Sequence, residues 1–492
     1  MSNIPRHLVM FASVVNLECD KRIINMVNSF CEAGTKVSVI CPPQSVDNEE
    51  ELAGLLHKSA TVYRLPQYFP EQYDLGEYLG YSLSTLPQRL YSKLFSMGVY
   101  RQFDEPISKL PWGARQLLQA VADVWYKRVI KIRQDGLANH RYWNIYLAQQ
   151  LPPAMFKKYK DVILLDCYDY FFFIQTLIIN KSIEPVDAVF CNDLSTLPAG
   201  CLIKELLGMT LIFDSHEAGV YAIMNPRHKP IAEANERWMY DLCDRFITVS
   251  DSCADYFVRR CPSLKPIVIV NGYPFPWDRL KDAPTLKAQL SLPASAPLAV
   301  YVGELSPLSY MDRFIHAIPY CKTNLHLAIL GHRGDIERLQ QISKELDLLG
   351  KRVFFLGRVK FSDVAGIIYG ADFGIIPNIQ NNTNPPWSIL SSKLFDYVQA
   401  ELPFISDFGP QIQKILDQFN IGQTANFQQE PAAIAKVLDA FYKQVQAGDF
   451  SSQERRRAKH NLAWPGNVAE LICLPPAVES SLPVAGKVPM SW

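Results

Sequence analysis

The sequence lacks an excess of charge of either sign, because 49 Lys and Arg residues are matched by 49 Asp and Glu residues. A neutral chain has no overall field that recruits nucleic acid, so we expect no nucleic-acid partner. A disulfide or zinc pattern is also missing. The 11 cysteines are an odd number, and none lies in a CxxC pair or near a suitably spaced His. We therefore expect reduced thiols and no metal site.

Long apolar runs and a signal-peptide pattern are absent as well. The longest apolar run, Tyr170 to Ile179, is too short to span a bilayer, and the start, MSNIPRHLVMFAS, has no h-region. The chain has 48% hydrophobic and 20% charged residues over 492 positions. That composition excludes a largely disordered chain, and that length exceeds one domain. These features predict a cytoplasmic protein of two domains.

Short apolar runs alternate with helical stretches, a pattern typical of parallel sheets covered by helices. The expected strands of the first half are His7–Ser13, Lys36–Cys41, Thr61–Leu65, Asp187–Cys191, Thr210–Phe213, Arg245–Val249 and Pro266–Val270. Those of the second half are Leu298–Gly303, Leu325–Gly331, Val353–Gly357, Phe373–Pro377 and Pro403–Ser406. Helices are expected at Lys21–Ala33, Tyr310–Tyr320, Asp335–Leu349, Ser362–Tyr369 and Ser391–Ala400.

This pattern predicts an α/β fold of two Rossmann-like, doubly wound domains that face each other across a cleft. The first domain covers residues 1–280 and includes a mainly helical insertion at about 70–160, where the alternation stops. The second covers 281–464, after a segment punctuated by prolines, and 465–492 form a tail that is partly loose. Ligands of such sheets bind at the carboxyl ends of the strands, so we expect a site in the cleft.

Polar clusters follow two expected strands of the first domain. Asn192 and Asp193 follow one strand, and the sequence Asp214-Ser215-His216-Glu217 ends the next. His216 stands between carboxylates, which would raise its pKa and let it exchange a proton near neutrality. The alternative is that Asp214 or Ser215 only caps a helix.

Asp20-Lys21-Arg22 begins the first expected helix. Free N–H groups and the positive end of the helix dipole favour an anion there. The alternative is that Asp20 caps the helix and Arg22 lies on a solvated face. The chain has no GxGxxG pattern, which argues against a nicotinamide dinucleotide as the ligand.

Glycines end three successive expected strands of the second domain, at Gly303, Gly331 and Gly357. A glycine lets a ligand approach the backbone closely. The basic residues that follow these glycines are His332, Arg333 and Arg358.

A helix then begins at Ser391 and Ser392, where its N-terminus would face the cleft. Lys393 stands beside that N-terminus and can neutralise a phosphate. Asp396, one helical turn further, can accept hydrogen bonds from ribose hydroxyls. Each of these features alone is ordinary turn chemistry, but their order is specific.

In that order the motifs resemble those of a known family. They are DKR with the later GTKV, NDLSTLPAG, FDSHE, DRFITVS, VNGYP, YVGEL, ILGH, FLGRV, ADFGIIP and SKLFDY. The chain resembles a GT-B glycosyltransferase and is most similar to glycosyltransferase family 4 (glycosyl transferases group 1). The likeness covers roughly residues 7–66 and 187–464.

The resemblance implies a hexosyltransferase-like enzyme of polysaccharide, lipid-linked glycan or glycoconjugate synthesis. Its nucleotide-sugar donor, a UDP- or GDP-sugar, is a substrate rather than a cofactor and is held mainly by the second domain. The first domain holds the glycan or lipid-linked acceptor, and transfer retains configuration without a catalytic metal. The implied catalytic residues are His216, Asp193 and Asn192. The implied donor-binding residues are Gly303, Gly331, His332, Arg333, Gly357, Arg358, Ser392, Lys393 and Asp396.

Four positions depart from the pattern of the family. Ser388 and Asp396 stand where two glutamates are common, Glu304 replaces a basic residue, and Asn192 replaces a histidine. These departures keep open a second function, that of a non-catalytic GT-B partner or scaffold of an active glycosyltransferase. Another GT-B enzyme, such as a sugar-nucleotide epimerase, is a third reading.

Basic residues are interleaved with apolar ones inside the expected insertion, over residues 85–133. They are Arg89, Lys93, Arg101, Lys127, Arg128, Lys131 and Arg133. A helix with such a basic face suits an anionic lipid surface, so our hypothesis is peripheral membrane contact through this stretch. The alternative is that its apolar residues pack on the first domain and its charges face water.

Overall fold

The structure is a computed structural model that describes residues 4–13, 17–42, 45–46, 48–64, 153–159, 162, 176, 185–219, 229–274, 284–331, 333–377 and 390–473. Most of the predicted insertion at 70–160, with the whole basic stretch 85–133, lies outside the described residues. His332 and Ser388 lie outside them too.

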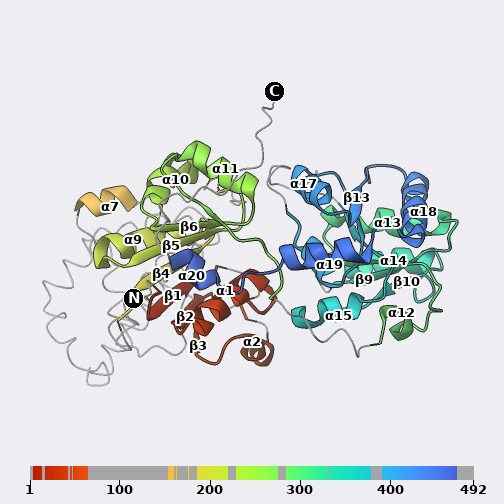
Figure 1. Ribbon diagram of the computed structural model, residues 1–492, viewed down its shortest axis with the longest axis horizontal. Coiled ribbons are helices and arrows are strands. Elements are labelled where there is room, and N and C mark those ends of the chain that lie inside the picture. The colour runs from red at the N-terminus through yellow and green to blue at the C-terminus, as the bar shows by residue number, and fades with distance from the viewer. Residues whose placement is uncertain are drawn as a thin grey trace, which may run out of the picture.

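Two parallel sheets form the fold, one in each half of the chain (Figure 1). The strands of the first sheet are β1 (His7–Phe11), β2 (Lys36–Cys41), β3 (Ala60–Arg64), β4 (Ala188–Asn192), β5 (Thr210–Ser215), β6 (Arg245–Thr248) and β7 (Ile267–Val268), in the order β3-β2-β1-β4-β5-β6-β7. Those of the second are β8 (Leu298–Val302), β9 (His326–Leu330), β10 (Val353–Phe355), β11 (Phe373–Ile376), β12 (Phe404–Ser406) and β13 (Gly422–Thr424), in the order β10-β9-β8-β11-β12-β13. In each sheet the strand that comes first in the sequence, β1 or β8, lies inside the sheet, and later strands are added outward on both sides of it. This order confirms the predicted doubly wound α/β class.

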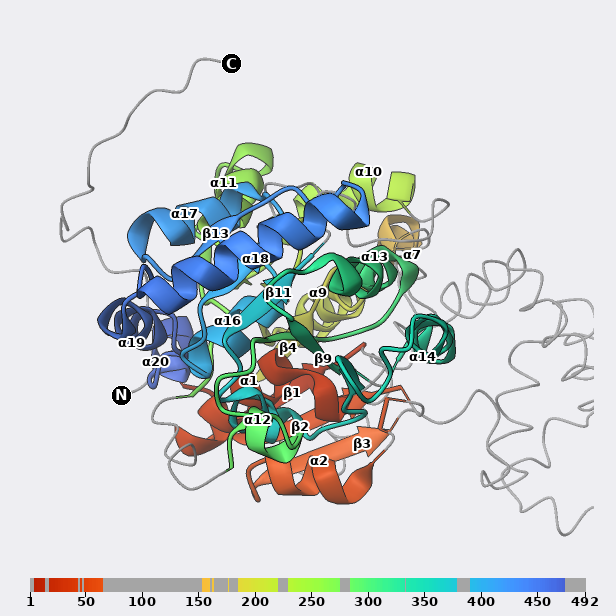
Figure 2. The same ribbon diagram turned by 90° about the vertical axis from the view of Figure 1, so that its right-hand side faces the viewer.

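Helices flank both sheets. Those of the first domain are α1 (Lys21–Glu32), α2 (Glu49–Leu55), α7 (Pro153–Tyr159), α9 (Leu197–Leu207), α10 (Lys229–Asp241) and α11 (Asp251–Arg260), with the 3-10 turn η1 (Leu17–Cys19). Those of the second are α12 (Leu286–Gln289), α13 (Met311–Ala317), α14 (Ile336–Glu345), α15 (Val364–Ile368), α16 (Ser392–Gln399), α17 (Pro410–Gln418), α18 (Pro431–Ala447) and α19 (Ser452–Asn461), with η6 (Pro307–Ser309), η7 (Ile318–Tyr320) and η8 (Phe361–Asp363). Figure 2 views the molecule from the second domain, where α18 lies over β11. There Phe441 packs edge-on against Phe373, with ring centroids 5.1 Å apart.

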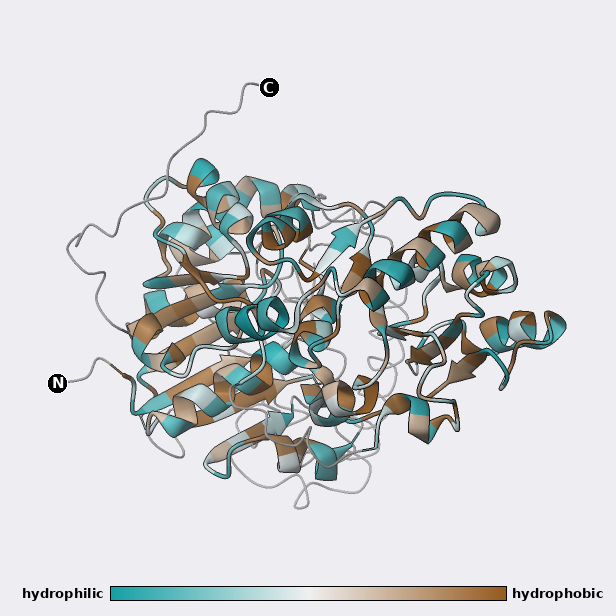
Figure 3. Ribbon diagram, turned by 45° about the vertical axis from the view of Figure 1, so that its right-hand side comes forward, coloured by the Kyte–Doolittle hydropathy of each residue, from teal (hydrophilic) through white to brown (hydrophobic). Residues whose placement is uncertain are grey.

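The strands supply the core, and the helices contribute one apolar face each. Every residue of β1, β4 and β8 is buried, as expected of parallel strands covered on both sides. In α1 the buried residues Ile23, Val27 and Phe30 recur at helical spacing. Figure 3 shows the result as largely brown strands between helices banded in brown and teal.

The end of the described chain returns to the first domain. After α19, the buried Trp464 donates its indole N–H to Ser29 Oγ over 2.9 Å and its backbone N–H to Tyr273 O over 2.8 Å. A short helix, α20 (Val468–Cys473), then packs against α1 and β6 (Figure 1). A side chain at Gly272 would lie 2.0 Å from the carbonyl oxygen of Leu462, so this crossing needs a glycine. The second half of the chain thus completes the core of the first domain.

Among the described residues, no helix combines the length and the apolarity needed to cross a membrane.

Candidate functional site

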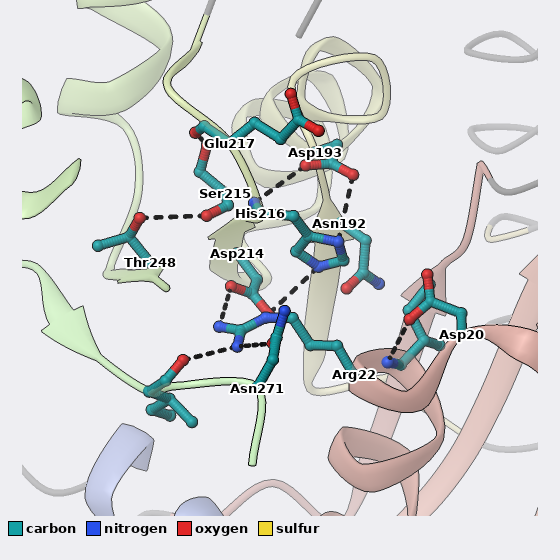
Figure 4. Close-up of polar contacts among 12 residues, drawn as sticks. Asp20, Arg22, Asn192, Asp193, Asp214, Ser215, His216, Glu217, Thr248 and Asn271 are labelled. Carbon is teal, nitrogen blue, oxygen red and sulfur yellow. Dashed lines mark hydrogen bonds and ion pairs between the residues drawn. The ribbon is translucent and has the colours of Figure 1, made fainter. Parts of the chain in front are cut away.

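A polar cluster lies at the carboxyl ends of β4 and β5, where the sequence predicted one (Figure 4). Asn192 and Asp214 are paired in register on these neighbouring strands. Asp193 and His216 follow directly, so adjacent strand ends bring the four residues together. Both clusters follow strands that the sequence predicted.

Arg22 reaches this cluster from the first turn of α1. Its Nε and Nη2 each donate to one carboxylate oxygen of Asp214, both over 2.7 Å. Its Nη1 donates to Ile269 O over 2.6 Å and to Asn271 Oδ1 over 2.8 Å. Arg22 is 3% exposed, so the alternative that it lies on a solvated face is wrong. Asp20 does cap α1, because its carboxylate accepts from Ile23 N over 3.0 Å.

Asp214 is fully buried, so its side chain pairs with Arg22 instead of capping a helix. Burial disfavours its charge, but the Arg22 guanidinium and the His216 ring hold the pKa of Asp214 well below its usual range. The Arg22–Asp214 pair therefore fixes α1 to the end of β5 through a bidentate ion pair.

His216 lies between two carboxylates, as its sequence neighbours suggested. Its Nδ1 is 3.3 Å from Asp193 Oδ2, and its Nε2 is 3.5 Å from Asp214 Oδ2. Burial lowers its pKa, but the two carboxylates outweigh burial and raise the pKa of His216 to about 9. At neutral pH the ring is therefore a cation that can donate a proton, rather than a base waiting for one.

The backbone conformation of Asp193 places its carboxylate beside His216. Asp193 has a φ of 63°, in the left-handed region, and its Oδ1 accepts from the backbone N–H of His216 over 3.0 Å. Asn192 is 1% exposed, and its Nδ2 donates to Phe11 O at the end of β1 over 2.7 Å. Its Oδ1 is buried and has no hydrogen-bond partner among the described residues. An unsatisfied buried acceptor beside a charged ring suits a hydroxyl-bearing ligand.

A cavity of about 270 Å³ lies between the two domains. Its lining comes from the carboxyl ends of β8, β9 and β10, from the starts of α15 and α16, and from the η1–α1 corner of the first domain, namely Cys19, Lys21, Val302, Gly303, Glu304, Leu330, Gly331, Arg333, Gly357, Val359, Val364, Ser392 and Asp396. A Cβ at Gly331 would lie 2.3 Å from the carbonyl oxygen of Gly303. The predicted glycines, Arg333, Ser392 and Asp396 thus meet at one place, and the glycines keep the backbone accessible.

The N-terminus of α16 opens at this cavity. Ser391 has the extended backbone of an N-cap, but its side chain accepts no capping hydrogen bond. Lys393 packs beside Gly303, with its Nζ 5.4 Å from the centre of the Tyr301 ring. Burial lowers the pKa of Lys393, although Asp396 and Glu304 oppose this. In the described part of the chain no carboxylate forms an ion pair with Lys393. The half-buried ammonium can therefore bind an anionic ligand.

Asp396 is 4% exposed and joins the two domains. Its Oδ1 accepts from the Tyr273 hydroxyl over 2.5 Å and forms an ion pair with Lys21 of the first domain. Within the described residues no contact of its Oδ2 is seen, which leaves that oxygen to a ligand in the cavity.

Arg358 also crosses between the domains. Its Nη2 donates to Glu51 Oε2 over 3.1 Å and to Glu18 Oε1 over 3.3 Å, and both carboxylates are buried. Arg358 is not among the residues that line the cavity, although the sequence suggested a phosphate contact for it. The sequence did not single out Tyr273, Cys19 or Glu18 as parts of this region.

Groups that could hold a metal ion are not found in the described ranges, where no three His, Cys, Asp or Glu side chains are suitably arranged.

No protein-family model matches the chain, and no curated protein matches it. Among solved structures it is similar to a sucrose-phosphate synthase from Thermosynechococcus elongatus, with a TM-score of 0.57 and 13% identity over 95% of this chain and 96% of that one. It is similar to HepE from Anabaena, solved with UDP and glucose, with a TM-score of 0.54 and 12% identity over 94% and 97%. It is also similar to WaaG, a glycosyltransferase involved in lipopolysaccharide biosynthesis, with a TM-score of 0.53 and 12% identity over 94% and 99%. At such identities the likeness shows the fold, and the predicted GT-B architecture is confirmed.

Proposed function

We propose that the protein is a glycosyltransferase that moves a sugar from a UDP- or GDP-sugar to a glycan, lipid-linked or other acceptor. The observation that carries this proposal is the interdomain cavity, which is lined by glycine backbones, by Ser392 at a helix N-terminus and by Asp396, with Lys393 packed against the lining residue Gly303. The HepE neighbour, which was solved with UDP and glucose, supports this class of ligand. Membership of family 4, retention of configuration, independence of a metal, and a cytoplasmic location with peripheral membrane contact through 85–133 belong to the same proposal.

The donor would lie with its diphosphate at the start of α16. There the N–H groups of the first turn and the Lys393 ammonium would bind phosphate oxygens. Asp396 Oδ2 would accept from a ribose hydroxyl. Fixed positive charge of this kind stabilises the departing nucleoside diphosphate, which gains negative charge in the transition state.

The first-domain cluster would bind the sugar and acceptor side of the reaction. His216 is protonated at neutral pH, so it would donate to an oxygen, and Asn192 Oδ1 would accept from a hydroxyl. In a retaining transfer the donor phosphate itself can take the proton of the acceptor hydroxyl, so none of these side chains needs to be the base.

Titration calorimetry with UDP- and GDP-sugars, UDP, GDP and the free nucleosides tests the proposal. Lys393→Ala should weaken nucleoside diphosphates about tenfold, the usual scale of one charged hydrogen bond, and nucleosides less than about twofold. Lys58→Ala is the matched control, because this exposed lysine precedes the amino end of β3, whereas the candidate site lies at carboxyl ends of strands. If the unaltered protein binds none of these ligands, the proposal fails.

A non-catalytic partner of an active glycosyltransferase is the second candidate. Glu304 favours it, because this exposed carboxylate lines the cavity at a place where a diphosphate would be expected to meet a basic residue. Analysis of the products separates the two functions. Bound donor that is neither transferred nor hydrolysed, with any acceptor offered, would support the partner role.

A further inference from the structure

We propose that Lys21 of the first domain is a ligand of the donor diphosphate, and that it exchanges Asp396 for the phosphates when the donor binds. This inference rests on the proposed function and assigns part of the donor site to the other domain.

Lys21 is placed at the cavity by the start of α1. It is the first residue of the helix, and the capping contact between Asp20 and Ile23 N fixes that turn. Its Nζ donates to the Tyr273 hydroxyl over 2.6 Å, lies 4.5 Å from the centre of that ring, and pairs with Asp396 Oδ1. The Lys21 side chain is 17% exposed and lines the same cavity as Gly303. The Lys21 ammonium therefore already lies beside the Asp396 carboxylate, which would accept a hydrogen bond from the ribose of the donor.

The charges of the cavity call for such a cation. Glu304 and Asp396 line it, and Lys393 makes no ion pair among the described residues. Arg333 is the other cation of the lining, and Lys21 would add a second positive charge against the two carboxylates if it turned from Asp396 to the phosphates. Lysine suits this exchange, because its ammonium is a point charge on a flexible stem with three donors that can change partner.

A second ion pair would keep the domains in place during the exchange. Glu18, two residues before the helix cap, accepts from Arg358 of the second domain over 3.3 Å. Ser252 of the first domain likewise accepts from Lys414 over 3.1 Å. At the η1–α1 corner, Glu18 of the first domain thus pairs with Arg358 of the second, and Lys21 pairs with Asp396. Arg358 does not line the cavity, so a donor bound there would not need to displace its contact with Glu18.

The exchange predicts that loss of Lys21 weakens the binding of a diphosphate but not the binding of a nucleoside. Calorimetry should be run with uridine, UDP and inorganic pyrophosphate on the unaltered protein, Lys21→Ala, Lys21→Gln and the control Lys58→Ala. We expect Lys21→Ala to weaken UDP and pyrophosphate about tenfold, since one charged contact to phosphate is lost. Uridine should bind equally well or a few-fold more tightly, because Asp396 is released. Lys21→Gln keeps a donor to Tyr273 without the charge, so it should behave like Lys21→Ala.

Cys19 reports whether the anion binds in this cavity. It is exposed, lines the cavity and stands two residues before Lys21. Pyrophosphate should slow its alkylation by N-ethylmaleimide, followed on the Cys19 peptide, in the unaltered protein and in Lys58→Ala but not in Lys21→Ala.

The outcomes separate this inference from the proposed function. If Lys21→Ala binds UDP and pyrophosphate as well as the unaltered protein, or loses uridine and UDP equally, the inference falls and the proposed function stands. If no nucleotide binds but pyrophosphate protects Cys19 through Lys21, the proposed function falls and Lys21 remains an anion ligand. If pyrophosphate and nucleotides both fail to bind, both fall.

Discussion

The charge of His216 should make the stability of the protein depend on pH above neutrality. The folded pKa of about 9 is higher than the ordinary value of 6.5, so the folded state holds the ring proton more tightly than the unfolded chain. The resulting stabilisation is fully present below pH 6.5 and is lost as the pH rises to about 9. A shift of this size corresponds to at most about 3 kcal/mol, and the coupling to Asp193 and Asp214 makes that an upper bound.

Replacing the histidine by glutamine removes the charge and keeps much of the volume. We expect His216→Gln to lower the free energy of unfolding at pH 6, by no more than about 3 kcal/mol, and by much less at pH 9. Urea unfolding followed by circular dichroism at pH 6, 7, 8 and 9 measures this, with the midpoints compared at equal slope. His57→Gln is the control, because the hydrogen bonds of its ring in the described part of the chain go to the hydroxyl and the backbone N–H of the nearby Ser59, in an exposed turn. A difference that stays constant from pH 6 to 9 would refute the reasoning.

The remaining predictions concern the Arg22 pair and the cavity glycine. Arg22→Met leaves the Asp214 carboxylate buried without its partner and should cost about 3–5 kcal/mol in urea unfolding. The double variant Arg22→Met with Asp214→Leu should recover most of that loss, whereas additive losses would contradict a buried pair. Gly331→Ala places a Cβ 2.3 Å from Gly303 O and should cost about 1–3 kcal/mol while weakening UDP. Gly366→Ala, which meets no atom within 4 Å, should do neither, and UDP binding by both variants is read by calorimetry.

Continuous apolar runs made the strands predictable. Lys36–Cys41 has the expected bounds because an apolar run ends there at prolines, and every expected strand of both halves exists within a few residues. β13 was missed because Gly-Gln-Thr carries no apolar run, and its three residues are only partly buried. α20 was missed because a short helix in a segment that leads into a proline-rich end has no local signal. It is fixed by its packing against α1.

The strand-end clusters were also predictable, but their partners were not. Arg22 and Asp214 lie 192 positions apart, and Lys21 and Asp396 lie 375 apart. The local sequence does not determine whether a charged residue on the first turn of a helix faces water or contacts a distant carboxylate. Tertiary packing decides this, which is why a solvated Arg22 stayed open as an alternative and Lys21 was assigned no partner from the sequence.

The return of the chain to the first domain has a consequence for protein synthesis. Trp464, Val468 and Ile472 are buried in the same cluster as Leu8 and Ile23. A ribosome therefore finishes the core of the first domain only after it has made the whole second domain. Until then the nascent first domain presents the apolar surface of α1 that α20 will cover, and chaperones recognise such surface. A chain that ends before Trp464 would therefore leave this apolar surface uncovered, even though it contains every strand of both sheets.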